Sequence, residues 1–218
     1  MNLEPTPLAG VLRWPGLAEY EGVLQAMKAS IEGRDPRDLD TLWLVEHNPV
    51  YTLGQAGKRE HVLSPGSIAV VQSDRGGQVT YHGPGQVVIY LMADLKRAGL
   101  SIRAMVSALE EALIDTLTQC GLPGATRESG APGVYLPQSD GRLAKIAALG
   151  LKVRKGYTYH GVALNVDMDL DPFLGINPCG FQDLQTVSMA SQGVRLPWET
   201  VALTLAGAMI RHCRLRVE

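Results

Sequence analysis

The most informative stretch of the sequence is Arg75-Gly-Gly-Gln-Val-Thr-Tyr-His82, continued by Gly83-Pro-Gly-Gln86 and the apolar run Val87-Val-Ile-Tyr-Leu-Met92. Residues 75 to 85 contain four glycines, which let a backbone reach positive φ or come close to a ligand. The apolar run predicts a buried strand that gives the loop a rigid base. Loop and strand together predict the rim of a binding site.

Composition predicts one soluble globular domain over residues 1–218. The chain is 45% hydrophobic and 19% charged with a formal net charge of −2, which excludes a disordered chain and gives no sign of nucleic-acid binding. Three cysteines indicate a reducing compartment, and prolines interrupt the N-terminus where a signal peptide would be apolar. The uncharged run at 76–93 is too rich in glycine and polar residues to span a membrane. We therefore expect a cytoplasmic protein that does not bind membranes.

Hydrophobic periodicity predicts helices between runs of strands. Strands are expected at 41–46, 68–72, 87–92, 133–136, 143–154 and 157–166, with a hairpin turn at 137–141. One helix is expected before Gly33, a second after its cap Ser101, and a third from Pro197. Their buried faces are predicted as Leu17, Tyr20, Leu24, Met27 and Ile31; Ile102, Met105, Val106, Leu109, Leu113 and Leu117; and Val201, Leu205 and Met209. The order predicts an α/β (α+β) fold, a single domain with a mixed, largely antiparallel sheet flanked by helices.

Cys179 is the candidate nucleophile, since Asn177-Pro-Cys-Gly180 predicts a thiol on a turn. Free cysteines are more often buried hydrophobes, and Cys120 and Cys213 fit that description at the apolar ends of predicted helices. A reactive thiol must be ionised, so it needs a cation or a base nearby. Both interpretations of Cys179 stay open on these grounds.

Lys145 is the candidate cation because it lies within the apolar stretch 143–151. Strand alternation predicts Leu143, Lys145 and Ala147 on one face. A lysine in a strand is usually solvated, yet the small residues beside this one leave room for a ligand. The sequence alone does not decide between these alternatives.

Other motifs exclude several classes of site. His82 and His160 each lie between an aromatic residue and a glycine, whereas His47 and His61 are expected to be structural or exposed. No spacing typical of zinc, calcium, a phosphate-binding P-loop, a dinucleotide fold or a serine hydrolase is complete. We therefore expect no metal site.

Five motifs in order resemble the lipoyl(octanoyl) transferase family. They are Glu46-His-Asn-Pro-Val-Tyr-Thr-Leu-Gly54, Arg75-Gly-Gly-Gln-Val-Thr-Tyr-His82, Lys145-Ile-Ala-Ala-Leu-Gly150, His160-Gly-Val-Ala-Leu-Asn165 and Ile176-Asn-Pro-Cys-Gly180. The resemblance covers about residues 41–181. It implies the fold of the biotin and lipoate protein ligases, and an octanoyltransferase that moves an octanoyl group from acyl carrier protein to a lysine.

The resemblance also assigns roles to residues. Its acyl-thioester cysteine falls on Cys179, and the lysine that lowers the pKa of that thiol falls on Lys145. The substrate-binding segments fall on Arg75, Gly76, Gly77, Gln78, Val79, Thr80, Tyr81 and His82, on Ala148, Leu149 and Gly150, and on Gly161, Val162 and Ala163.

The partners implied are octanoyl-acyl carrier protein as donor, and as acceptors the apo lipoyl domains of 2-oxoacid dehydrogenases and the glycine cleavage H protein. No cofactor, ATP or metal is implied, and we expect a monomer. Because both partners are acidic, Lys152, Arg154 and Lys155 are candidates for a docking patch, with a solvated turn as the alternative.

Two other functions compete with this one. The first is a lipoate or biotin protein ligase that activates its acid with ATP, and the second is a degenerate protein that only binds acyl carrier protein. A ligase needs no cysteine, and a mere binder needs neither Cys179 nor Lys145, so the sequence favours the transferase.

Overall fold

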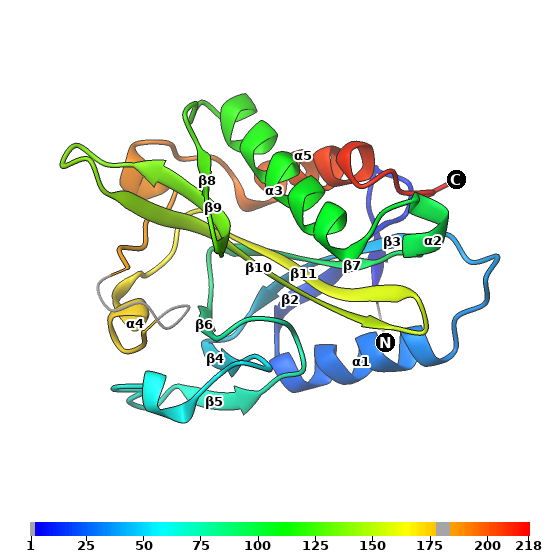
Figure 1. Cartoon of the computed structure of the whole chain (residues 1–218), viewed down its shortest axis with the longest axis horizontal. Coiled ribbons are helices and arrows are strands. Elements are labelled where there is room, and N and C mark those ends of the chain that lie inside the picture. The colour runs from blue at the N-terminus through cyan, green and yellow to red at the C-terminus, as the bar shows by residue number, and fades with distance from the viewer. Residues whose placement is uncertain (1–2, 178–183) are drawn as a thin grey trace.

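A computed structural model describes residues 3–177 and 184–218 of the chain. Within these residues, one mixed sheet of eight strands runs through the molecule in the order β1-β2-β3-β7-β11-β10-β9-β8 (Figure 1). Its strands are β1 (Glu4–Pro5), β2 (Val11–Ala18), β3 (Thr41–His47), β7 (Gln86–Met92), β8 (Thr126–Glu128), β9 (Ala131–Pro137), β10 (Leu143–Arg154) and β11 (Tyr157–Asn165). Only β2 and β3 pair in parallel within this sheet, so the predicted mixed, largely antiparallel arrangement is confirmed.

Strand β7 lies at the centre of this sheet, and its sequence shows why. Every residue from Gln86 to Met92 is buried. Val87, Ile89 and Leu91 contact the helix layer on one face, while Val88, Tyr90 and Met92 contact the layer on the other. A strand covered on both faces favours apolar residues throughout, which explains the continuous apolar run from Val87 to Met92.

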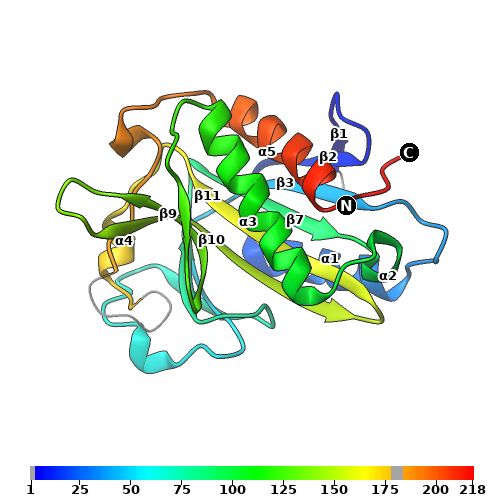
Figure 2. The same ribbon diagram turned by 45° about the horizontal axis from the view of Figure 1, so that its top comes forward.

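Helices cover the two faces unequally. Figure 2 shows α3 (Ile102–Gln119) and α5 (Trp198–His212) side by side over one face, where their apolar sides join the largest core cluster. The opposite face carries α1 (Tyr20–Glu32). Short helices α2 (Leu95–Ala98) and α4 (Asp171–Leu174) and the 3-10 turns η1 (Arg59–His61) and η3 (Ala190–Gln192) occupy connections.

A second, three-stranded sheet lies beside α1, below the large sheet in Figure 1. It consists of β4 (Val50–Leu53) between β5 (Ala69–Gln72), which is parallel to it, and β6 (Val79–His82), which is antiparallel. The motif around residues 75–82 therefore starts in a loop between two strands of this small sheet and ends in β6.

Two predicted helix faces need correction. Leu17 belongs to β2 and is 47% exposed, because Pro15 and Gly16, with φ of 63°, interrupt the pairing of β2 with β3 and delay the helix to Tyr20. Ser101 caps α3 as predicted, its hydroxyl accepting from the Ala104 amide at 3.2 Å. Ile102, however, is 51% exposed at the first turn of that helix.

The remaining predicted strands and the third helix are confirmed to within a few residues. Val201, Leu205 and Met209 are buried as expected, and the turn between β10 and β11 holds Lys155 and Gly156 at positive φ. No helix in the described part of the chain is long and apolar enough to cross a bilayer.

Candidate active site

A cavity of about 380 Å³ lies between the two sheets and under the first turn of α3. Its walls come from the 75–78 loop, β6, β10 and β11, with the 130–132 turn and Ile102 and Val106 of α3 at one side. The lining residues include Arg75, Gly76, Gly77, Gln78, Val79, Thr80, His82, Ala148, Leu149, Gly150, Gly161, Val162 and Ala163. The structure thus brings all the predicted substrate-binding residues except Tyr81 to one cavity.

Tyr81 faces the other side of β6. It is 3% exposed and packs against Tyr51 and Phe173 in the core of the small sheet, with ring centroids 5.5 Å apart in both pairs. Alternation along a strand explains this, because Thr80 and His82 point toward the cavity. The apolar surface expected from Tyr81 therefore supports the small sheet, which carries the cavity wall.

The 75–78 loop is fixed against β10 by close backbone contacts. The Gly76 amide donates to the Leu151 carbonyl at 3.0 Å, and a Cβ on Gly76 would lie 3.2 Å from that same oxygen. The Arg75 guanidinium donates to the Gly76 carbonyl at 2.9 Å and to the Thr52 carbonyl at 2.6 Å. Arg75 therefore ties its own loop to β4, in addition to bordering the cavity.

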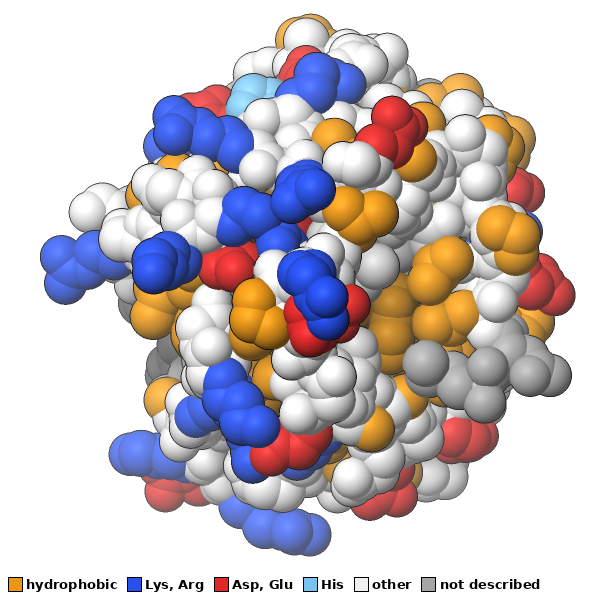
Figure 3. All heavy atoms as spheres, turned by 90° about the vertical axis from the view of Figure 1, so that its right-hand side faces the viewer, with side chains coloured by type: hydrophobic (Ala, Val, Ile, Leu, Met, Phe, Trp, Pro, Cys, Tyr) orange, Lys and Arg blue, Asp and Glu red, His pale blue; other side chains and the backbone are white. Residues whose placement is uncertain are grey.

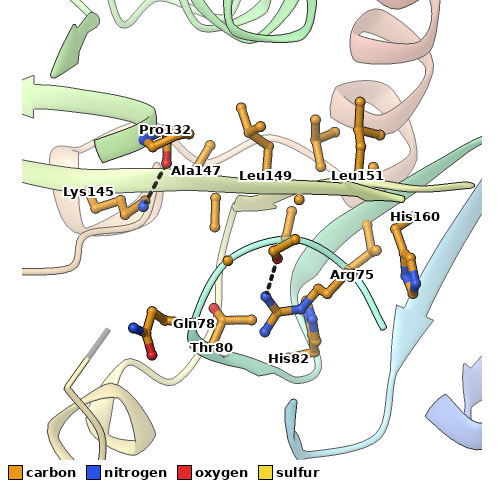
Figure 4. Close-up of a pocket in the computed structure, with 18 of the residues that line it drawn as sticks. Arg75, Gln78, Thr80, His82, Pro132, Lys145, Ala147, Leu149, Leu151 and His160 are labelled. Carbon is orange, nitrogen blue, oxygen red and sulfur yellow. Dashed lines mark hydrogen bonds between the residues drawn. The ribbon is translucent and has the colours of Figure 1, made fainter. Parts of the chain in front are cut away.

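Lys145 lies at one end of the cavity, where β10 leaves its regular pairing with β9. A β-bulge separates Lys145, opposite Tyr135, from Ala147, opposite Val134. The Lys145 side chain is buried, and its Nζ donates to the Pro132 carbonyl at 3.0 Å (Figure 4). Nζ also lies 5.3 Å from the Tyr135 ring centroid. The solvated alternative for Lys145 is therefore wrong.

Because of this β-bulge, the prediction that Lys145 and Ala147 share one face of the strand is wrong. Ala147 packs with Ala144 and Ile146 in the core beneath the helices, so it does not share the face of Lys145. Because the extra residue of a bulge shifts the alternation by one position, Ala148 and Gly150 come onto the Lys145 side. Figure 4 shows Leu149 and Leu151 pointing away from the loop that carries Arg75.

Cys179 lies outside the described residues. On its N-terminal side, Ile176 bridges to Val62, and Phe173 lines the cavity. On its C-terminal side, the Gln185 carbonyl accepts from the Lys145 amide at 2.8 Å, and Thr186 also lines the cavity. Cysteines 120 and 213 are half-buried and buried respectively, and burial raises the pKa of both thiols, which agrees with the structural roles expected for them.

Neutral histidines form the opposite end of the cavity. Gln86 donates through its amide nitrogen to Asn165, so its oxygen accepts from His82 Nδ1 at 2.7 Å and leaves Nε2 as an acceptor. His160 Nε2 donates to Asp74 at 2.9 Å, and its Nδ1 has no hydrogen-bond partner among the described residues. Burial holds the pKa of both imidazoles below the usual value, well below for His82, so both are neutral at pH 7.

Sequence reasoning missed the groups that support these histidines. Asp74 holds His160, and the hydrogen bond from that imidazole keeps the pKa of the carboxyl well below its usual range. His47, expected to be structural or exposed, is a buried structural residue. Its imidazole donates to the Ala18 carbonyl at 3.0 Å and accepts from the Tyr90 hydroxyl at 2.7 Å, and burial lowers its pKa to about 4. These contacts join positions 29 to 86 residues apart, so no local pattern could have indicated them.

The two ends of the cavity are well separated. Leu151 pairs with His160, and Leu151 lies six positions after Lys145 along β10, roughly 15–20 Å at about 3.3 Å per residue. The wall between them is formed by apolar and small residues, among them Val88, Ala148 and Val162. The cavity can therefore hold a linear apolar group with its reactive end beside Lys145.

The predicted basic patch lies away from this end. Arg154 and Lys155 both pair with Glu32, at 2.7 and 3.0 Å, and Arg154 is nine residues along β10 from Lys145, roughly 30 Å. Figure 3, which views the face that carries the β10–β11 turn, shows basic side chains interspersed with acidic ones. The geometry does not favour this patch as a docking site next to Lys145.

Comparison with known proteins decides the family. The family model of the lipoyl protein ligase A/B catalytic domain matches residues 20–209. The chain belongs to this family. Within it, the chain is 61% identical over 194 residues to an octanoyltransferase of Bordetella petrii, covering 88% of this chain and 91% of that protein. An octanoyltransferase of Burkholderia pseudomallei is 50% identical over 209 residues, covering 95% and 85%.

Solved structures of ligases share the fold of the family. A putative lipoate protein ligase from Thermoplasma acidophilum superposes with a TM-score of 0.72 at 18% identity, covering 94% of this chain and 84% of its own. Lipoate-protein ligase A bound with ATP gives 0.64 at 17% identity, covering 94% and 83%. The predicted fold is confirmed by these likenesses, and the prediction of an acyltransferase enzyme is confirmed by the close relatives.

Proposed function

We propose that this protein transfers the octanoyl group of octanoyl-acyl carrier protein to a specific lysine of apo lipoyl domains and of the glycine cleavage H protein. The transfer would be the first step of protein lipoylation. The observation that carries the proposal is the buried Lys145 at one end of an elongated, largely apolar cavity, in a chain at least half identical to relatives named octanoyltransferase.

The reaction is proposed to run through a thioester on Cys179. The thiolate attacks the donor carbonyl, a new carbon–sulfur bond forms, and the phosphopantetheine thiolate leaves and takes up a proton. The acceptor amine then attacks the enzyme thioester, a carbon–nitrogen bond forms, and the Cys179 thiolate departs. Exchange between thioesters is nearly isoenergetic, whereas the amide product is stable, so the second step gives the overall direction.

Lys145 is proposed to serve both steps. Its ammonium favours ionisation of a nearby thiol, and as a free amine it can take the proton that the acceptor lysine loses. The Pro132 carbonyl, 3.0 Å from Nζ, holds the end of the side chain in a fixed place, which such proton transfer requires.

The apolar wall is proposed to bind the octanoyl chain. Each buried methylene contributes about 0.8 kcal/mol, so a slot closed at its far end discriminates chain length. At that end lies His160 Nδ1, which has no hydrogen-bond partner among the described residues, and covering such a polar atom with further methylenes is unfavourable.

The edge of β10 supports an oxyanion site. The Leu151 carbonyl points away from β11, since it accepts from Gly76, and alternation directs the backbone of Leu149 to the same edge, beside the cavity. The Leu149 amide, at the edge that does not pair with β11, is therefore our candidate donor to the tetrahedral intermediate, whereas alternation directs the Gly150 amide toward β11. Loss of one such donor costs about 3–4 kcal/mol of transition-state stabilisation.

We propose that the reaction needs neither ATP nor a metal. The likeness to ATP-bound lipoate-protein ligase A is a likeness of fold, at 17% identity, and leaves the source of the activated acyl group to experiment.

Intact mass measurement tests the proposal. The protein is incubated with octanoyl-acyl carrier protein without ATP, and an octanoyl adduct is expected on the natural chain but not on Cys179→Ala. Cys213→Ala, which removes a buried thiol outside the cavity, is the matched control and should keep the adduct. An adduct that appears only with free octanoate and ATP would instead indicate a ligase. Absence of an adduct under both conditions would indicate a protein that only binds acyl carrier protein.

A further inference from the structure

Glu110 is a buried carboxylate in the middle of α3, a helix whose other buried residues are apolar apart from Thr116. Its side chain is 10% exposed, and Oε1 accepts from the Gly133 amide at 3.0 Å. Oε2 lies 3.4 Å from Arg127 Nε, on β8. A charged group is rarely buried unless it is paired and hydrogen-bonded, and here the partner of Oε1 is a backbone amide of β9.

That amide belongs to the segment that holds Lys145. The carbonyl of Pro132, which precedes Gly133, accepts from Lys145 Nζ at 3.0 Å. Gly133 has φ of 143°, and a Cβ there would lie 2.5 Å from Lys145 Cε. The backbone of β9 is therefore shaped around the lysine side chain, and Glu110 fixes it from the helix side.

We propose that Glu110 is a positioning residue for Lys145, acting through the Gly133 amide and the Pro132 carbonyl. The inference rests on the proposed function of Lys145 and extends it to a residue that touches neither the cavity nor the reacting groups. Without an acceptor for the buried Gly133 amide, β9 must move to find another partner, and the Pro132 carbonyl moves with it.

The chain supplies a matched control in the next residue. Glu111 also pairs with Arg127, but its side chain is 51% exposed and Gly133 does not bond to it. Glu111→Ala removes the same charge from the same helix and the same arginine, without removing the acceptor of Gly133.

The experiment measures octanoyl transfer and the pH dependence of Cys179 alkylation by iodoacetamide in the Glu110 and Glu111 variants. Glu110→Ala should lower kcat roughly 10- to 100-fold with a smaller change in KM, and should move the alkylation profile in the same direction as Lys145→Ala. Glu110→Gln, which keeps an oxygen acceptor, should restore most of the rate. Glu111→Ala should match the natural chain in both measurements.

Stability is measured in parallel, because a merely structural role would lower the melting temperature without moving the alkylation profile. Should Glu110→Ala fail to fold, Glu110→Leu keeps the packing volume and still removes the acceptor, and the same shifts are expected. If the Glu110 variant that folds has the same alkylation profile and the same kcat as Glu111→Ala, the inference is overturned.

Failure of the inference is distinguishable from failure of the proposed function. A Lys145→Ala profile that shifts while the Glu110 profile does not would overturn only the role of Glu110. A Lys145→Ala profile equal to that of the natural chain would overturn the proposed role of Lys145, and the positioning role of Glu110 with it.

Discussion

Replacement of Lys145 by alanine is expected to lower the rate of octanoyl transfer by about 100- to 10,000-fold, the usual contribution of a positioned acid–base group. The side chain is 5% exposed, and its ammonium is held by the Pro132 carbonyl against the Tyr135 ring. If this cation stabilises the thiolate of Cys179, its loss should also raise the pH at which that thiol becomes reactive by about 1–3 units. Transfer kinetics and the pH dependence of iodoacetamide alkylation measure the two effects.

Two further variants separate charge from packing. Lys145→Met keeps an apolar stem over Tyr135 and removes only the amine, so it should behave like Lys145→Ala. Lys152, on the same strand but outside the cavity lining, is the control, and Lys152→Ala should transfer at nearly the natural rate. Equal rates for the Lys145 and Lys152 variants would contradict the assigned role.

Replacement of Asp40 by alanine is expected to cost about 3–5 kcal/mol of unfolding free energy, because it leaves buried cations without their counter-charge. The Asp40 side chain is fully buried, and Oδ1 lies 2.5 Å from Arg97 and 3.4 Å from Arg34. Its oxygens also accept from the backbone amides of Asp94 and Arg216. One carboxylate thus joins the loop after α1, helix α2 and the C-terminal segment.

Thermal and urea unfolding measure this cost. For a chain of this length the melting temperature should fall by roughly 10–15 °C. Asp38, exposed in the same loop, is the control, and Asp38→Ala should cost no more than about 1 kcal/mol for its one hydrogen bond to the Asp35 amide. An Asp40→Ala protein as stable as Asp38→Ala would mean that the ion cluster adds nothing to the fold.

The sequence predicted those features that depend on local pattern. The run at 87–92 is apolar at every position because β7 is covered on both faces, and no other arrangement suits it as well. Ser101 marks the start of α3 because its hydroxyl satisfies a helix amide that has no partner within the helix. The cavity wall was predicted from glycines that allow close backbone approach, as at Gly76 beside Leu151, or positive φ, as at Gly77.

What the sequence did not predict depends on contacts distant along the chain. The bulge after Lys145 is a feature of the pairing between β10 and β9, and the apolar sequence of β10 alone does not indicate it. Strand β2 was hidden because Pro15 and Gly16 weaken its pattern, although its parallel pairing with β3 tolerates the interruption. Asp74 and Glu110 are ordinary surface residues by sequence, and only the fold places them behind His160 and Gly133.

Isolation of the enzyme loaded with octanoate as a thioester tests whether Cys179 carries the acyl group between donor and acceptor. The protein carrying an octanoyl group on Cys179 is freed of donor and mixed with an apo lipoyl domain, without ATP, and both masses are followed within one turnover. We expect the octanoyl mass to leave the enzyme as it appears on the acceptor, in a form that resists hydroxylamine as an amide does. An octanoyl group that stays on Cys179, or that reaches the acceptor only after ATP and free octanoate are added, would contradict it.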